Sequence, residues 1–265
     1  MSTNDADPRR GALIATVSTV GVFAGLTLLI VNAPGWSKVR DSFFNGHHLR
    51  RSMPDIVRGF GLNVRLFLIA EVFVLIIGLA VAVVRNLPGP ALVPFRFLAT
   101  AYTDVFRGVP TILLIYLFGF GMPALGLNRP WNSPLLWGTV ALSLNYGAYV
   151  SEVFRSGIRS VHPSQMAAAR SLGLSQWTAF RHVIVPQAIR RVIPPLLNDF
   201  VALQKDTALV ATLGPLEALR HAQIYAASKF NYTAFVGAAL LFLALTIPLA
   251  RATDALLRRQ ERDRR

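Results

Sequence analysis

The sequence contains no cysteine, and only three of its 27 basic residues are lysines. The absence of thiols excludes disulfide bonds and thiolate metal ligands. None of the lysines (Lys38, Lys205, Lys229) follows a Gly-x-x-x-x-Gly-Lys-Ser/Thr loop, so the chain has no Walker-type ATP site of its own. The five histidines show no metal-ligand spacing, and no Ser/His/Asp arrangement is apparent. The sequence therefore gives no indication of an enzyme, a bound cofactor or a metal site.

Charge is also scarce, since only 15% of the residues are charged while 53% are hydrophobic, and the mean hydropathy is +0.47. This composition is typical of a membrane protein. The net charge of +14 is compatible with nucleic-acid binding, but the arginines lie beside apolar stretches. That placement is typical of topology signals and of contact with anionic lipid headgroups. We therefore expect membrane lipid, and no nucleic acid, among the partners.

Apolar stretches predict an all-α integral membrane protein with six crossings, because each is about long enough to span some 30 Å of hydrocarbon. They are residues 11–32, 59–84, 109–127, 134–151, 192–213 and 233–250. We interpret the first as an uncleaved helix and not as a signal peptide, because it is long and lacks a small-x-small cleavage site. Residues 33–58 are expected to lie in the membrane interface, and residues 85–108 to follow the cytoplasmic surface.

The distribution of basic residues predicts the orientation. Six arginines accompany a single acid between residues 152 and 191, and six more arginines lie between residues 251 and 265. Placing both regions and both termini in the cytoplasm puts 17 Lys/Arg inside and 10 outside, which sum to the 27 of the chain. The basic residues of 33–58 oppose this orientation, but the rest of the tally outweighs them.

The stretch from His162 to Pro186 is too polar to cross a bilayer and too apolar for an ordinary surface loop. Pro163 opens a predicted helix, and Gly173 supplies a left-handed stop just after its end. Ser175 can cap a second helix. The pattern predicts a cytoplasmic helix-turn-helix with apolar faces, which we call the arm (residues 162–186).

The arm resembles the EAA loop of ABC importer permeases, through Ala167-Ala168-Ala169, three residues, Gly173, nine residues, and Val183-Ile184-Val185-Pro186. Flanking motifs resemble the polar amino-acid branch of that family: Arg107-Gly108-Val109-Pro110, Tyr149-Val150-Ser151-Glu152-Val153-Phe154-Arg155-Ser156-Gly157-Ile158, Pro194-Pro195-Leu196-Leu197-Asn198-Asp199-Phe200 and Lys205-Asp206-Thr207-Ala208-Leu209. The likeness covers roughly residues 55–255. The chain departs from the family at Ala167, where a glutamate is usual, so a salt bridge made by that acid cannot be assumed.

This resemblance implies a five-span permease core with one extra N-terminal transmembrane helix and a cytoplasmic coupling arm. It implies three regions: residues 1–54, a permease domain of residues 55–255 with its coupling arm at 155–186, and a basic tail of residues 256–265. It also implies a polar amino-acid importer in a bacterial cytoplasmic membrane. Its partners would be a second permease subunit, two ATP-binding cassette subunits that bind the ATP, and an extracytoplasmic solute-binding protein. The need to enclose a path with few helices independently favours a dimer.

Two groups of residues are candidate functional sites. The candidates for ATPase coupling are Ala167, Ala168, Ala169, Arg170, Gly173, Leu174, Trp177, Phe180 and Pro186. The candidates for the translocation path are Asn145, Glu152, Asn198, Asp199, Lys205, Asp206 and Thr207. Each group has a structural alternative: the arm arginines can contact lipid headgroups, its aromatic residues can pack against the spans, and polar residues in spans often bond only to neighbouring helices.

Other functions leave different patterns. A secondary transporter would have inverted repeats and intramembrane acids, whereas no repeat is visible and only Glu71 lies inside an otherwise apolar span. For Glu71, packing or hydrogen bonding is the favoured role over substrate or proton transfer. A membrane-embedded enzyme would need clustered catalytic groups, and the amino-acid-type motifs argue against an exporter. An importer permease for a different small polar solute remains the alternative within the family.

Overall fold

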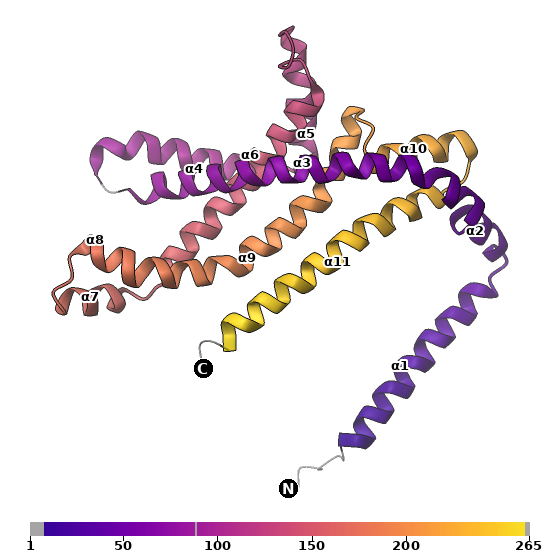
Figure 1. Ribbon diagram of the computed structural model, residues 1–265, viewed down its shortest axis with the longest axis horizontal. Coiled ribbons are helices and arrows are strands. Elements are labelled where there is room, and N and C mark those ends of the chain that lie inside the picture. The colour runs from indigo at the N-terminus through magenta and orange to yellow at the C-terminus, as the bar shows by residue number, and fades with distance from the viewer. Residues whose placement is uncertain (1–7, 88, 263–265) are drawn as a thin grey trace.

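The computed structural model of the chain describes residues 8–87 and 89–262, and within them every regular element is helical, as predicted. The α-helices are α1 (Pro8–Val31), α2 (Trp36–Phe43), α3 (Gly46–Asn86), α4 (Val93–Gly108), α5 (Thr111–Gly121), α6 (Pro134–Arg159), α7 (Pro163–Ser171), α8 (Gln176–Ala179), α9 (Val185–Asp206), α10 (Ala218–Lys229) and α11 (Thr233–Arg262). The 3₁₀-helices are η1 (Pro90–Leu92), η2 (Pro123–Leu125) and η4 (Thr207–Leu213), and η3 (Phe180–Ile184) is a π-helix. Figure 1 shows α6 crossing α3, and α4, α5 and α9 also pack against α6.

α3 is longer than the predicted second span, because it runs without a break for 41 residues. The side chain of Asn45 starts the helix by accepting hydrogen bonds from the backbone N–H groups of His47 and His48, at 3.0 and 3.3 Å. Residues 46–58, predicted to lie in the membrane interface, therefore form the first turns of α3, and only α2 forms a separate short helix there. At 1.5 Å per residue α3 measures about 61 Å, roughly twice the hydrocarbon thickness.

The predicted third span, residues 109–127, contains α5 and η2, but α5 is one half of a bent pair with α4, and that this pair crosses the membrane stays a prediction. α4 and α5 meet at a bend of 106° around Val109 and Pro110. Pro110 disfavours helix at the preceding residue, and Val109 accordingly adopts an extended backbone. α5 alone, at 11 residues, spans only about 16 Å. α4 packs against α3 and α6, with Thr103 completely buried, so residues 93–108 are part of the bundle and not a free surface segment.

Three described helical stretches are long and apolar enough to cross a membrane, namely 14–31 in α1, the stretch 36–86, and 233–258 in α11. The bent pair α4–α5 adds a fourth if it counts as one span. α6 and α9 carry more polar residues, as expected for helices that pack inside a bundle. The total of six crossings stays a prediction.

α6 lies at the centre, in contact with α3, α4, α5 and α9. Its close packing on α3 depends on glycine, since a Cβ atom on Gly78 would lie 2.5 Å from Val150, and one on Gly147 would lie 2.8 Å from Ile77. Small residues at such crossings let helix backbones approach closely, which is how helices associate in membranes. The result is a core of residues from α3, α5, α6, α9 and η4.

A buried carboxylate joins α10 to residues 46–65 of α3, the half that the predicted orientation places outside and that we call the outer half of α3. Glu217 is 0% exposed and accepts hydrogen bonds from Asn63 Nδ2 at 2.9 Å and from the backbone N–H groups of Leu219 and Arg220. The Asn63 side-chain oxygen accepts from the backbone N–H of Ala218 at 3.1 Å. Burial raises the pKa of Glu217, and these hydrogen bonds oppose the rise. The contact fixes α10 along one side of the outer half of α3.

α1 extends away from the other helices (Figure 1), and none of its residues 14–31 is buried. Its side chains are apolar around the whole circumference, which is typical of a helix surrounded by lipid. That α1 is an extra transmembrane helix outside the permease core stays a prediction.

Candidate functional site

The arm forms the predicted helix-turn-helix between α6 and α9. His162 caps α7 by accepting a hydrogen bond from the backbone N–H of Ser164 at 3.2 Å, with Pro163 in the first helical turn. Gly173 has a φ of +84°, the left-handed conformation expected after a helix end. Ser175 caps α8 through the backbone N–H of Thr178 at 3.1 Å. From α8 the chain continues through the π-helix η3 directly into α9.

Two large apolar side chains of the arm are strongly exposed. Leu172 is 83% exposed and Trp177 is 68% exposed, so the alternative that Trp177 packs against the chain's own spans is wrong. Phe180 is half-buried, stacks on Trp177 with ring centroids 6.2 Å apart, and also packs on the base of the arm. Met166, Gln176, Trp177 and Phe180 line a cavity of about 360 Å³. Such an exposed apolar hollow is typical of a protein-binding surface.

Among the remaining arm candidates, one is buried and the others lie at or near the surface. Ala169 is 4% exposed and packs inside the arm, and Leu174 is half-buried. The candidates with exposed side chains are Ala167, Ala168, Arg170 and Pro186. Because Ala167 points to solvent, the fold itself does not require alanine at this position.

The base of the arm is fixed to both adjoining spans. Val161, Ile184 and Ala188 form a small buried cluster where α6, η3 and α9 meet. Arg191 of α9 donates a hydrogen bond to the backbone oxygen of Ser160, just after α6. Sequence reasoning missed Arg191, because nothing in the spacing of two residues 31 positions apart indicates the contact. A displacement of the arm would therefore be transmitted to α6 and α9.

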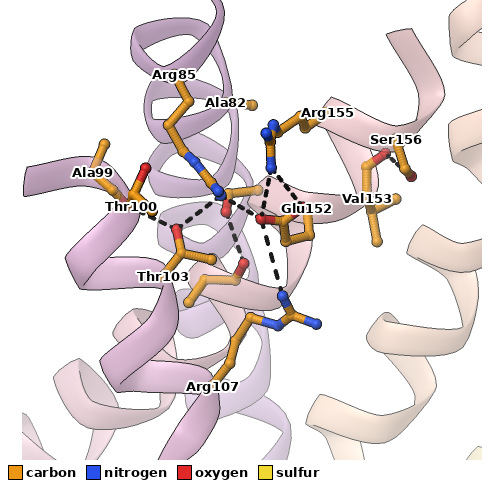
Figure 2. Close-up of polar contacts among 12 residues, drawn as sticks. Ala82, Arg85, Ala99, Thr100, Thr103, Arg107, Glu152, Val153, Arg155 and Ser156 are labelled. Carbon is orange, nitrogen blue, oxygen red and sulfur yellow. Dashed lines mark hydrogen bonds and ion pairs between the residues drawn. The ribbon is translucent and has the colours of Figure 1, made fainter. Parts of the chain in front are cut away.

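Glu152, one residue beyond the predicted fourth span, is the centre of an ion-pair cluster. Figure 2 shows arginine side chains converging on its carboxylate from α3 and α4 and from α6 itself. Arg85 donates a hydrogen bond to it, and Arg155 and Arg107 lie at 3.4 and 4.0 Å. The Arg85 side chain is only 6% exposed and also donates to Thr103 at 3.2 Å. The cluster ties three helices together near the C-terminal end of α6, from which the chain continues to the arm.

Burial by itself raises the pKa of Glu152, but the hydrogen bond and charge of Arg85 and the charges of Arg155 and Arg107 outweigh it, so the pKa lies below 4.5. The carboxylate is therefore ionised at neutral pH. Three positive charges face one negative charge, and the Nε atom of Arg155 is buried without a hydrogen-bond partner among the residues that the structure describes. Glu152, a candidate for the translocation path, is thus engaged in structural ion pairs.

Two further path candidates are bonded inside the bundle. Asn145, 1% exposed, donates to the backbone oxygen of Phe106 at 2.7 Å and accepts from Thr111 at 3.2 Å. Thr207, completely buried, accepts a hydrogen bond from Asn63 Nδ2 of α3 at 3.3 Å and donates one to the backbone oxygen of Gln204 at 2.8 Å. Their polar groups hold helices together, which is the structural alternative given above.

The other four candidates form two stripes along α9. Asn198 and Lys205, seven residues apart, are both exposed on one side of the helix. Asp199 and Asp206 lie on the adjacent stripe and are half-buried, and Asp206 accepts a hydrogen bond from Tyr146 at 2.8 Å. A lysine in lipid would cost about 2.5–3.5 kcal/mol, so the exposed stripe must face water or another protein.

The comparisons with known proteins agree with one another. The family model described as "Binding-protein-dependent transport system inner membrane component" matches residues 93–262. The chain is 37% identical to the "Probable glutamine ABC transporter permease protein GlnM" of Bacillus subtilis, over 71% of this chain and 84% of that protein. It is 30% identical to the "Arginine transport system permease protein ArtQ" of the same organism, over 74% of this chain and 88% of that protein.

Among solved structures, one described as "Crystal structure of an amino acid ABC transporter with histidines" is similar, with a TM-score of 0.71 and 30% identity. The match covers 78% of this chain and 94% of the other. The helical arrangement of most of the chain is therefore that of a known transporter fold.

Proposed function

This chain belongs to the family of binding-protein-dependent transport system inner membrane components, and we propose that it is the membrane-spanning subunit of an ATP-driven importer for polar amino acids. The observation that carries the proposal is the arm, an exposed apolar surface fixed at its base to two spans. The substrate class rests on the named relatives, two of which are permeases for glutamine and arginine.

The arm receives force from a separate ATPase subunit that binds the ATP. Leu172 and Trp177 supply the apolar contact area, and Arg170 and Arg181 are exposed beside it and available to acids of that subunit. Because the base is buried between α6 and α9, a rotation of the arm moves both helices together. The nucleotide state of the ATPase then biases the membrane segments between two arrangements.

The translocation path runs along the exposed stripe of α9. Asn198 and Lys205 on this stripe face water or a second permease subunit, since neither is stable in contact with lipid. Asp199 and Asp206 lie next to them, close enough to the stripe to contact a passing amino acid. A single chain leaves this stripe uncovered, which supports pairing with a second permease subunit, identical or related, to enclose the path.

The membrane is a bacterial cytoplasmic membrane, and both termini and the arm lie on its cytoplasmic side. The distribution of arginines supports this orientation, because six arginines lie between residues 152 and 191 and six more between residues 251 and 265. The turn after α5 and helix α10 then face outward, toward an extracytoplasmic solute-binding protein. The complete importer has two permease subunits and two ATPase subunits.

Reconstitution tests this function directly. Vesicles containing the permease, its ATPase and ATP should accumulate a polar amino acid when the solute-binding protein is present, and vesicles lacking the ATPase should not. Glutamine and arginine are the first substrates to test, because they are named for the relatives. Uptake driven by a sodium or proton gradient without the ATPase would instead identify a secondary transporter.

Restoring the family's usual acid at position 167 should have little effect. Ala167 is exposed, so a glutamate fits without displacing other side chains. We expect Ala167→Glu to keep ATP-driven uptake within about twofold of the parent, in line with the small effect of most surface substitutions. Initial uptake rates in the same vesicles measure it. A severe loss would indicate that the ATPase groove has become specific for alanine at this position.

A further inference from the structure

The turn between α10 and α11 holds an exposed aromatic side chain in a disfavoured backbone conformation. Phe230 has a φ of +49° and a side chain that is 85% exposed. Glycine or asparagine usually occupies this left-handed position after a helix, because bulkier residues are disfavoured there. A side chain so exposed contributes little to the packing of its own chain. An aromatic residue in this conformation therefore points to a contact outside the chain.

This turn is bonded to the end of α2. The backbone N–H of Tyr232 donates to the backbone oxygen of Ser42 at 2.7 Å. Phe43, the last residue of α2, stacks on Tyr232 with ring centroids 5.2 Å apart. The two segments therefore form one unit, which we call the α2–α11 junction (residues 36–44 and 230–233).

The junction lies at the level where two apolar helices end. α1 ends at Val31, and the chain turns tightly into α2, since the backbone N–H of Trp36 donates to the oxygen of Ala33 at 3.0 Å. At the other end of α2, the Thr233 hydroxyl at the start of α11 donates to the backbone oxygen of Ser42 at 3.4 Å. If α1 and α11 cross the membrane as predicted, these two helix ends lie at one face of the hydrocarbon. Both ends of α2 then lie at that face, so α2 runs along the membrane surface.

α2 has the amphipathic pattern of a helix in this position. Trp36, Val39 and Phe43 share one side of the helix. Asp41 lies on the opposite side. Val39 is 42% exposed, and Phe44, directly after the helix, is 60% exposed. Aromatic residues are enriched at membrane–water interfaces, so these exposed side chains fit the headgroup region of a bilayer.

We propose that the α2–α11 junction is a lipid-binding anchor, in which Phe44, Phe230 and the apolar side of α2 insert among the headgroups. The headgroup layer is about 5–8 Å deep, and Phe230 lies just before α11, within reach of it. Lipid is favoured over a soluble protein, because the hydrocarbon begins directly beside the junction. The anchor holds the end of α1, none of whose residues 14–31 is buried, beside the other helices. This inference rests on the crossings of α1 and α11 that are part of the proposed function.

Depth-dependent quenching tests the anchor in the full-length protein. Because the chain has no cysteine, Phe230→Cys and Val39→Cys each introduce a single thiol for an environment-sensitive fluorophore. In lipid vesicles, a nitroxide carried by the lipid near its headgroup should quench both labels at least about twofold more than one near the bilayer centre. Gly21→Cys, in the middle of α1, where a Cβ atom meets nothing within 4 Å, should show the reverse order.

Two further labels control for exposure and for the side of the helix. Leu172→Cys lies in the arm at a position that is 83% exposed, close to the 85% of Phe230, and neither nitroxide should quench it. Asp41→Cys lies on α2 opposite to Val39, and the headgroup nitroxide should quench it less than Val39→Cys. The pair on α2 remains informative even if the turn at Phe230 does not tolerate a label.

Three results would each overturn the anchor: equal quenching of the labels at positions 230 and 172, equal quenching at 39 and 41, or emission at 230 that changes only when the solute-binding protein is added. The last would indicate a protein contact. Failure of the crossings looks different, because the label at position 21 would then escape the nitroxide near the bilayer centre. Failure of the importer function is separate again, since the parent protein would show no ATP-driven uptake while the quenching pattern stayed as expected.

Discussion

Replacing Gly173 with proline or aspartate is expected to abolish ATP-driven uptake, with at least a hundredfold fall, while the protein still inserts into the membrane. Gly173 lies at φ +84°, and its backbone N–H donates to the oxygen of Arg170 at 3.0 Å. Other L-residues pay about 1–2 kcal/mol to adopt this left-handed conformation. Proline cannot adopt it, since its ring holds φ near −65°, and it also removes the N–H donor.

The reason for this expectation is the position of the turn. Space is not limiting, because a Cβ atom on Gly173 meets nothing within 4 Å. The backbone is the constraint, since a different φ at this point would reorient α7 relative to α8. The exposed side chains of Leu172 and Trp177 would then no longer form one surface for the ATPase. The spans would be unaffected, because they pack through other residues.

Gly126 provides the matched control. It has a φ of +70°, also meets nothing within 4 Å, and lies in the turn after η2, far along the chain from the arm. Gly126→Asp should therefore carry the same backbone strain but keep most of the uptake. Uptake rates are compared at equal amounts of membrane-inserted protein. If Gly173→Asp and Gly126→Asp reduced uptake equally, or if neither did, the arm would not be the coupling element.

The shape of the arm could be predicted from the sequence because its signals are local. Pro163, Gly173 and Ser175 each determine the backbone within a few residues of themselves, and the structure has a helix start, a left-handed stop and a cap at these positions. The long apolar spans were predictable for the same reason, since length and composition suffice.

The other features of the fold and of the site depend on contacts between segments that lie far apart in the sequence. The bend between α4 and α5 is signalled by Pro110, but a proline also fits the first turn of a straight span, and only packing on α3 and α6 decides between the two. The burial of Asn145 and Thr207 likewise depends on partners from other helices. In the same way, the sequence pattern marks Glu152 as unusual but cannot assign Arg85, which is 67 residues away.

Removing the charge of Glu152 is expected to produce the largest loss of stability. Arg85 has a side chain that is 6% exposed, and it would be left as a buried charge without its counter-ion. Breaking a buried ion pair in this way typically costs about 3–5 kcal/mol. Glu152→Gln keeps the size of the side chain, so the loss would be due to charge. Thermal or denaturant unfolding of the purified protein in detergent measures it.

The other arginines of the cluster supply the internal controls. Arg107→Gln should cost less than about 1 kcal/mol, because Arg107 is 42% exposed and lies 4.0 Å from the carboxylate. The double change Arg85→Gln/Glu152→Gln should cost less than the sum of the single changes, since neither partner is then left charged and alone. Equal losses from Glu152→Gln and Arg107→Gln would show that the cluster is only a weak surface pair.

The same cluster makes stability depend on pH in a defined direction. The pKa of Glu152 is lowered in the folded protein from its usual 4.5, so the folded state favours the ionised carboxylate. The stabilisation is therefore fully present above about pH 4.5 and is lost as the pH falls through the lower folded pKa. Glu152→Gln should remove this part of the acid sensitivity. The test measures the unfolding midpoint of the parent and of the variant between pH 3 and pH 7. It shows whether Glu152 holds α3, α4 and α6 together through its charge. Parallel curves over that range would contradict it.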